Sequence, residues 1–225
     1  MCGIAGLLGP GFTPGQIDPM IAAMRHRGPD GQGTWTDPAA GLQLGHARLA
    51  IIDLETGTQP MASPDGRHVI VFNGEIYNYP ELRPDLEAKG WVFRTRSDTE
   101  VLLAGLVLEG PGFLSRTIGM FALALWDCLD RSLLLARDRM GIKPLYIAET
   151  PAGLAFASEL KSLLALPGID RRLDPAAVEA YLTLRYVPAP LTMVAGIRKF
   201  PAAHHAVARD GRLDRPVRWW DIAFR

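Results

Sequence analysis

The 225-residue chain is 48% hydrophobic and 21% charged, a composition typical of a soluble globular protein built on one large domain. Its 24 basic and 24 acidic residues cancel, which argues against nucleic acid or an anionic membrane surface as a partner. No apolar run approaches the roughly 18 residues of a membrane-spanning helix, and the amino end lacks the pattern of a signal peptide.

The amino-terminal third is predicted to combine short strands with one helix. Residues 4–8 are apolar and predict a buried strand, which a Gly-Pro-Gly sequence ends. Four apolar side chains then recur at helical spacing and predict an amphipathic helix: Ile17, Met20, Ile21 and Met24. Further short strands are expected at residues 33–36, 42–47 and 69–72.

The rest of the chain predicts more strands, with helices between them. Pro80 in a first turn indicates a helix over residues 80–89, and Ser97 with Glu100 forms the sequence of a capping box that starts another. Later strands, hairpins and a last helix are expected at residues 121–126, 133–136, 145–157, 174–184 and 204–218. Because the strands gather in two groups with helices outside, the pattern favours a layered α+β fold over a doubly wound βαβ fold.

A cysteine stands one residue from the amino end of the chain. If Met1 is removed, as is common before a small residue, Cys2 carries a thiol and a free α-amine on one carbon atom. An α-amine has a reference pKa of about 7.7–8.0, so near neutral pH it can take the thiol proton directly or through a water. Cys2 is therefore a candidate nucleophile with its own general base. The alternative is an ordinary cysteine on a frayed end.

The cysteine and histidine counts limit the chemistry further. The only two cysteines are Cys2 and Cys128, and a disulfide between them would consume the candidate nucleophile. We therefore expect two free thiols in a reducing compartment, the cytoplasm, with a structural role for Cys128. The five histidines show no metal-type spacing with another histidine or a cysteine, so no metal site is expected.

Three polar groups elsewhere complement the thiol. Arg48 stands at a strand end, Asn73-Gly74 follows an apolar strand, and Asp98 begins a helix. Each has an ordinary explanation: a surface ion pair, a turn, and a carboxylate that favours a helix start. Together they suit an α-amino acid amide, because arginine binds a carboxylate, aspartate binds an ammonium, and the asparagine amide with the next backbone N–H can hold an oxyanion.

These segments, in this order, resemble the glutamine amidotransferases of the N-terminal-nucleophile (Ntn) hydrolase class. The closest likeness is to the glutaminase half of glutamine-hydrolysing asparagine synthetases, and it covers essentially the whole chain. Any one of the motifs could arise by chance, whereas eight in order are specific. They lie at residues 1–6, 25–30, 44–49, 72–79, 96–100, 119–127, 136–146 and 156–161.

The resemblance implies a fold and catalytic roles. The fold would be a four-layer αββα sandwich, two antiparallel sheets flanked by helices. Cys2 would attack the side-chain amide of glutamine, form a glutamyl thioester and release ammonia. Asn73 and the N–H of Gly74 would form the oxyanion hole.

The resemblance also implies which residues bind the substrate. Arg48 would bind the α-carboxylate of glutamine and Asp98 its α-ammonium, with help from Glu75. Backbone groups near Leu49 and Ile51 would line the pocket. The run from Arg137 to Tyr146 belongs to the same signature, and we interpret it as structural or interdomain.

Asparagine synthetases also carry an ATP-using domain with a Ser-Gly-Gly pyrophosphate loop, and these 225 residues contain no such string. We therefore interpret residues 1–217 as the glutaminase domain and residues 218–225 as the start of a linker to a synthetase domain of the same polypeptide. The glutaminase needs no cofactor, whereas the synthetase would use ATP and Mg to amidate aspartate. The sequence leaves a homodimer open.

Other interpretations remain at the level of sequence. The amide acceptor of the whole protein could be a carboxylate other than aspartate. A non-catalytic interaction module on the Ntn fold would have no use for an oxyanion hole beside an amino-terminal thiol. A nucleotide-handling enzyme lacks support because no phosphate-cradling glycine loop is present.

Overall fold

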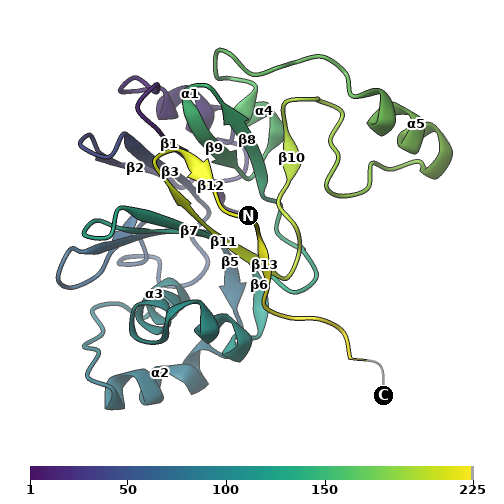
Figure 1. Cartoon of the computed structure of the whole chain (residues 1–225). Helices are drawn as coiled ribbons and strands as arrows, with labels where there is room; N and C mark the ends of the chain where they lie inside the picture. The colour runs from purple at the N-terminus through teal and green to yellow at the C-terminus, as the bar shows by residue number, and fades with distance from the viewer. Residues whose placement is uncertain (224–225) are drawn as a thin grey trace.

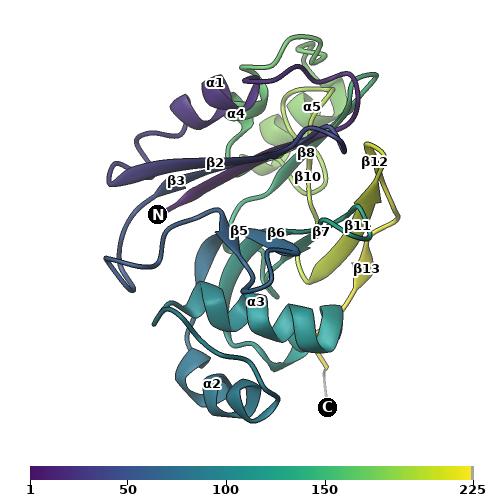
Figure 2. The ribbon, with the colours of Figure 1, turned by 90° about the vertical axis from the view of Figure 1, so that its left-hand side faces the viewer.

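The computed structural model describes residues 1–223, which form two antiparallel sheets stacked between two layers of helices (Figure 1). The residues that the sequence analysis assigns to a linker are described only to 223; residues 224–225 lie outside. Seen from the side, the layers run from α1 and α4 through the two sheets to α3 and α2 (Figure 2). The predicted α+β sandwich is thus confirmed.

The first sheet contains the strand that follows the amino end. Its order is β10-β8-β9-β1-β3-β2, with β1 near the centre. The strands are β1 Gly3–Leu8, β2 Gly31–Asp37, β3 Leu42–Arg48, β8 Tyr146–Thr150, β9 Gly153–Ala157 and β10 Arg198–Lys199. Two helices cover its outer face, α1 Ile17–Ala22 and α4 Leu160–Leu163.

The second sheet has the order β12-β11-β7-β6-β5-β4, and β13 also pairs with β11. The strands are β4 Met61–Ala62, β5 His68–Ile76, β6 Gly119–Asp127, β7 Ser132–Arg137, β11 His204–Arg209, β12 Arg212–Leu213 and β13 Val217–Arg218. Its outer face packs against α2 Tyr79–Ala88, α3 Asp98–Glu109 and the 3-10 helix Gly110–Arg116.

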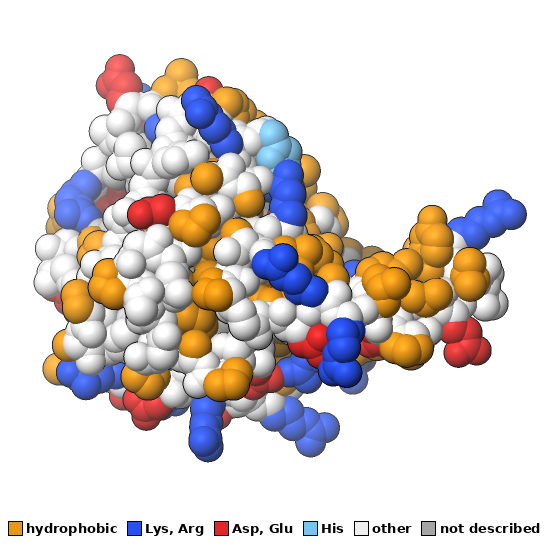
Figure 3. Space-filling model, turned by 90° about the horizontal axis from the view of Figure 1, so that it is seen from above, with side chains coloured by type: hydrophobic (Ala, Val, Ile, Leu, Met, Phe, Trp, Pro, Cys, Tyr) orange, Lys and Arg blue, Asp and Glu red, His pale blue; other side chains and the backbone are white. Residues whose placement is uncertain are grey.

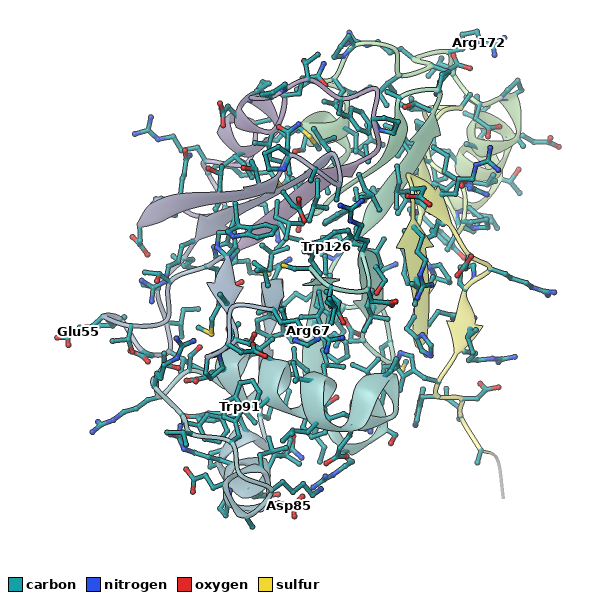
Figure 4. All side chains as sticks on the ribbon, turned by 60° about the vertical axis from the view of Figure 1, so that its left-hand side comes forward. Glu55, Arg67, Asp85, Trp91, Trp126 and Arg172 are labelled. Atoms are coloured by element: carbon teal, nitrogen blue, oxygen red, sulfur yellow. The ribbon has the colours of Figure 1, made fainter. Side chains whose placement is uncertain are left out.

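Apolar side chains fill the space between the sheets and both spaces between sheet and helices. Trp126 is fully buried between the sheets, and its indole N–H donates to Asp37 across that gap at 3.3 Å (Figure 4). Trp91 lies in the helical layer beyond the second sheet (Figure 4). Three continuous apolar layers therefore fix how the two sheets face each other.

The last helix, α5 Pro175–Leu184, stands away from the sandwich on the long segment between α4 and β10 (Figure 1). Asp174 caps it by accepting the N–H groups of Ala176 and Ala177. Seen from above, the projecting part carries a cluster of hydrophobic side chains (Figure 3). None of the helices in the described part of the chain is long and apolar enough to cross a membrane.

Two sequence interpretations near the site are wrong. Asn73 and Gly74 form no turn: β5 continues through them to Ile76, paired with β6. The capping box is incomplete. The Ser97 side chain accepts the N–H of Thr99, but the Glu100 carboxylate accepts the N–H groups of Arg94 and Thr95 instead of that of Ser97. In both places contacts with other parts of the chain override the local preference.

Candidate active site

Every residue that the sequence assigned to the site lines one pocket of about 120 Å³. These residues come from four segments: the start of β1, the end of β3 and the loop after it, the middle of β5, and the start of α3. They are Cys2, Arg48, Leu49, Ile51, Asn73, Gly74, Glu75 and Asp98. Pairing of β1 with β3 explains part of this, since Gly3 faces Ala47 and Cys2 is therefore next to the strand end at Arg48.

Cys2 is anchored through its backbone and its sulfur. Its carbonyl accepts a hydrogen bond from Nε of Arg27 at 2.9 Å, and Arg27 in turn pairs with Glu159 at 3.0 Å. The Leu49 N–H donates to Sγ at 3.3 Å. Both cysteines are free, as predicted.

The backbone of β5 presents a free donor to the pocket. The N–H of Phe72 donates to the Gln59 side chain at 2.6 Å, and the N–H of Ile76 donates to Asp98 at 2.9 Å. Because N–H groups two residues apart point to the same side of a strand, the N–H of Gly74 points to this same edge. Its partner on β6, Phe121, bonds to Asp138 instead. Gly74 therefore offers its N–H to a ligand.

Position 74 must be a glycine because the neighbouring strand β6 leaves no room for a side chain. A Cβ placed there would lie 2.3 Å from the carbonyl oxygen of Met120 and 2.8 Å from Cα of Phe121. Only glycine lets the two strands approach so closely at this point.

The side chain of Asn73 is 1% exposed and lies against Ser158. Nδ2 is 3.4 Å from the Ser158 hydroxyl oxygen, which also accepts the N–H of Ile4 at 3.0 Å, and Oδ1 has no partner in the described part of the chain. With the amide turned over, the Ser158 hydroxyl donates to Oδ1 and Nδ2 is free to donate to a ligand. Ser158 thereby links the Asn73 side chain to the first strand.

Arg48 is held by the loop that follows β3. Its guanidinium donates to the carbonyl of Leu54 at 3.0 Å and to that of Asp53 at 2.6 Å. Glu55 stands at the outer tip of this loop (Figure 4). A guanidinium has five N–H donors, so those not used by the loop remain for a carboxylate in the pocket.

Asp98 is a buried carboxylate without a cation. It is 4% exposed, accepts the N–H of Ile76, and has no ion-pair partner within residues 1–223. Burial raises its pKa to about 6, and the nearby Glu75 raises it as well. A positively charged ligand group would relieve this unfavourable burial.

His46 is a buried histidine that does not line the pocket. It is fully buried, its ring Nε2 lies 3.2 Å from the carbonyl of Phe72, and burial lowers its pKa to about 4. The neutral ring therefore links β3 to β5, one strand from each sheet. No histidine lines the pocket in the part of the chain that the structure describes. In the same residues, no group of three His, Cys, Asp or Glu side chains could hold a metal.

The sequence analysis missed several pocket residues. Gln59 comes from an irregular loop and bridges Phe72 to Thr99 by its amide. Lys143 lies in the run that the sequence analysis interpreted as structural or interdomain, yet it lines the pocket. Gln59 carries no local sequence signal, because an irregular loop reaches the site only through the tertiary fold. Lys143 belongs to a recognised motif, but its place in the pocket depends on the same tertiary fold.

Residues 1–220 match the family model described as a glutamine amidotransferase domain. The asparagine synthetase [glutamine-hydrolyzing] 1 of Bacillus subtilis is 41% identical over 220 residues, which are 95% of this chain and 34% of that protein. Asparagine synthetase B of Escherichia coli is 44% identical over 142 residues, 63% of this chain and 25% of that protein. The chain thus spans about a third or less of the length of these relatives.

Solved structures support the same fold. Glutamine phosphoribosylpyrophosphate amidotransferase from B. subtilis aligns with a TM-score of 0.70 and 21% identity, over 97% of this chain and 49% of that one. A structure described as the allosteric regulatory enzyme of purine biosynthesis gives a TM-score of 0.73 at 20% identity, with the same two coverages. At such identities the likeness concerns the fold alone. The match to the family model over residues 1–220 shows that the chain belongs to the glutamine amidotransferase domain family.

Proposed function

We propose that the chain is a cysteine glutaminase that converts glutamine and water to glutamate and ammonia. The observation that carries this proposal is the convergence, in one pocket, of an amino-terminal thiol, two candidate oxyanion donors, an arginine and an uncompensated carboxylate. Those groups match the parts of glutamine one by one: amide, carboxylate and ammonium.

Substrate binding follows from the charges. The α-carboxylate of glutamine pairs with the free N–H groups of Arg48, and its α-ammonium pairs with Asp98, assisted by Glu75. Leu49 and Ile51 form the wall between these ends. The side-chain amide then lies toward Cys2.

The chemistry requires that Met1 is absent, so that Cys2 has a free α-amine. The amine takes the thiol proton while the sulfur attacks the amide carbon. Charge that develops on the amide oxygen is stabilised by Nδ2 of Asn73 and the N–H of Gly74. The protonated amine returns its proton to the departing ammonia, and water then hydrolyses the glutamyl thioester.

In the whole protein, the ammonia would pass to a synthetase region and amidate aspartate, with ATP and Mg. The names of the relatives support asparagine synthesis as the role of that region. A free nucleophilic thiol further suits the reducing cytoplasm. A different carboxylate acceptor is the alternative, and the pocket carries no group that would distinguish the two.

Incubation of the purified chain with glutamine in the absence of ATP tests the proposal. We expect glutamate and ammonia in equal amounts, measured by enzyme-coupled assays. A folded chain that starts at Cys2 and releases no ammonia above the background of buffer alone would refute it.

Glutamine binding should weaken in acid because Asp98 becomes protonated. The pKa of the free carboxyl is about 6, and the bound ammonium favours the charged form, so the proton must leave before glutamine binds. We expect Kd to rise about tenfold for each pH unit below the pKa of Asp98. Calorimetric titration of the Cys2→Ala variant, which cannot turn over, measures this.

Asp98→Asn provides the control, because its amide oxygen can still accept the N–H of Ile76. This variant should bind glutamine weakly, with no dependence on pH over the same range. If the parent binds equally tightly above and below the pKa of Asp98, the carboxylate does not hold the ammonium.

A further inference from the structure

Lys143 places a buried positive charge beside the amino end of the chain. The residue is 4% exposed and lines the same pocket as Cys2. In the described part of the chain, the only hydrogen-bond partner of its ammonium is Sδ of Met1, 3.1 Å from Nζ. No carboxylate lies within ion-pair distance there, although burying an ammonium without a partner is costly. Removal of Met1 takes away even this contact.

The backbone around Lys143 holds the ammonium in place. The Asp138 carboxylate accepts the N–H groups of Met140, Ile142 and Lys143 at 2.9–3.1 Å. The carbonyl of Lys143 accepts Nε of Arg137 at 2.7 Å. Both backbone groups of Lys143 are thus bonded, which holds its segment beside the amino end.

Several charged groups face this corner of the pocket. Arg27 is bonded to the Cys2 carbonyl, and Lys143 adds a second cation. The carboxylate of Asp30 acts on the amino end and that of Glu75 on Lys143, while Asp138 is engaged by backbone N–H groups. Burial is the largest cause that holds the pKa of the Met1 α-amine below its ordinary value; Cys2 and Asp30 oppose this shift, and Arg27 and Lys143 add to it.

We propose that Lys143 is a positioning residue for proton transfer: its buried ammonium disfavours a second positive charge at the amino end and so keeps the α-amine of Cys2 neutral. This inference rests on the proposed function, in which that amine is the base. In the step concerned, the S–H bond of Cys2 breaks and its proton bonds to the α-nitrogen, leaving a thiolate beside Lys143. The lysine thus favours both the neutral amine before transfer and the thiolate after it.

The test measures the charge state of the amine without any turnover. In the Cys2→Ser background, where no thiol competes, the α-amine is labelled with acetic anhydride over a series of pH values, and the amino-terminal peptide is quantified by mass spectrometry. Lys143→Met should raise the pH of half-maximal labelling by about one unit. Lys143→Arg should restore the value of the lysine protein, because it restores the charge.

Lys199→Met is the matched control, since Lys199 is also a partly buried lysine but bonds to the Val187 carbonyl away from the pocket. It should leave the midpoint unchanged. Lys143→Gln replaces the methionine variant if the latter does not fold. If the pH of half-maximal labelling is unchanged in Lys143→Met or Lys143→Gln, the inference is overturned. If that pH shifts as expected but the parent protein does not hydrolyse glutamine, only the proposed function is overturned.

Discussion

Replacing Cys2 with alanine should abolish glutamine hydrolysis and leave the fold intact. The side chain lies before the first strand and contributes no core packing, and its hydrogen bonds involve only Leu49. Cys2→Ser should retain little activity, because a hydroxyl near neutral pH is a far weaker nucleophile than a thiolate. Ammonia release under saturating glutamine measures both variants, with circular dichroism to verify the fold.

Cys128 supplies the matched control. It lies in the turn after β6 and packs against the core between the sheets, its Sγ lies 3.8 Å from the Gly66 carbonyl, and burial raises the pKa of its thiol. Cys128→Ala should therefore keep nearly full activity. The assignment fails if loss of Cys128 inactivates the protein while Cys2→Ala remains active.

Asn73→Ala should lower kcat by about 10²–10³, the usual effect of removing one oxyanion-hole donor. The amide meets the substrate oxygen only as that atom gains charge, so KM should change comparatively little. Arg48 and Asp98 bind groups that do not change during the reaction, and their alanine variants should act mainly on KM. Steady-state kinetics of the three variants separates the two kinds of effect.

The position of Asn73 within β5 makes this test cleaner than a turn position would. An alanine keeps the backbone pairing with Ala122, so the strand itself is preserved. Asn78→Ala is the control: its amide bonds the backbone of Arg116 and Ile118, outside the pocket, so its loss should reduce stability without lowering kcat. A folded Asn73→Ala variant with the parent kcat would show that Asn73 is not an oxyanion donor.

The polar residues that the sequence selected line one pocket, and three of them stand next to boundaries of strands or helices that the sequence shows. Cys2 precedes an apolar strand, Arg48 ends one, and Asp98 starts a helix. Side chains at the ends of strands and helices leave the core and can line a pocket. The motifs, taken together and in order, assigned these residues to one site. Pairing of β1 with β3 and of β5 with β6 then puts them around the same pocket.

Other parts of the site could not be predicted because they depend on contacts distant in sequence. Asn73-Gly74 has the local preference of a turn, and pairing with β6 overrides it. Ser158 meets Asn73 across 85 positions of the chain. In the sequence, Lys143 has the character of a solvated loop residue. In the structure, the Asp138 carboxylate holds its segment beside the amino end. None of these contacts has a local signature.

Cys2, as the first residue of the mature chain, should carry a glutamyl thioester during turnover. Mass spectrometry after rapid acid quenching of the protein with glutamine tests this most directly. We expect an amino-terminal peptide that begins at Cys2, lacks Met1 and carries the added mass of one glutamyl group. Active protein that retains Met1 throughout, or that carries the glutamyl group on Cys128, would contradict the account.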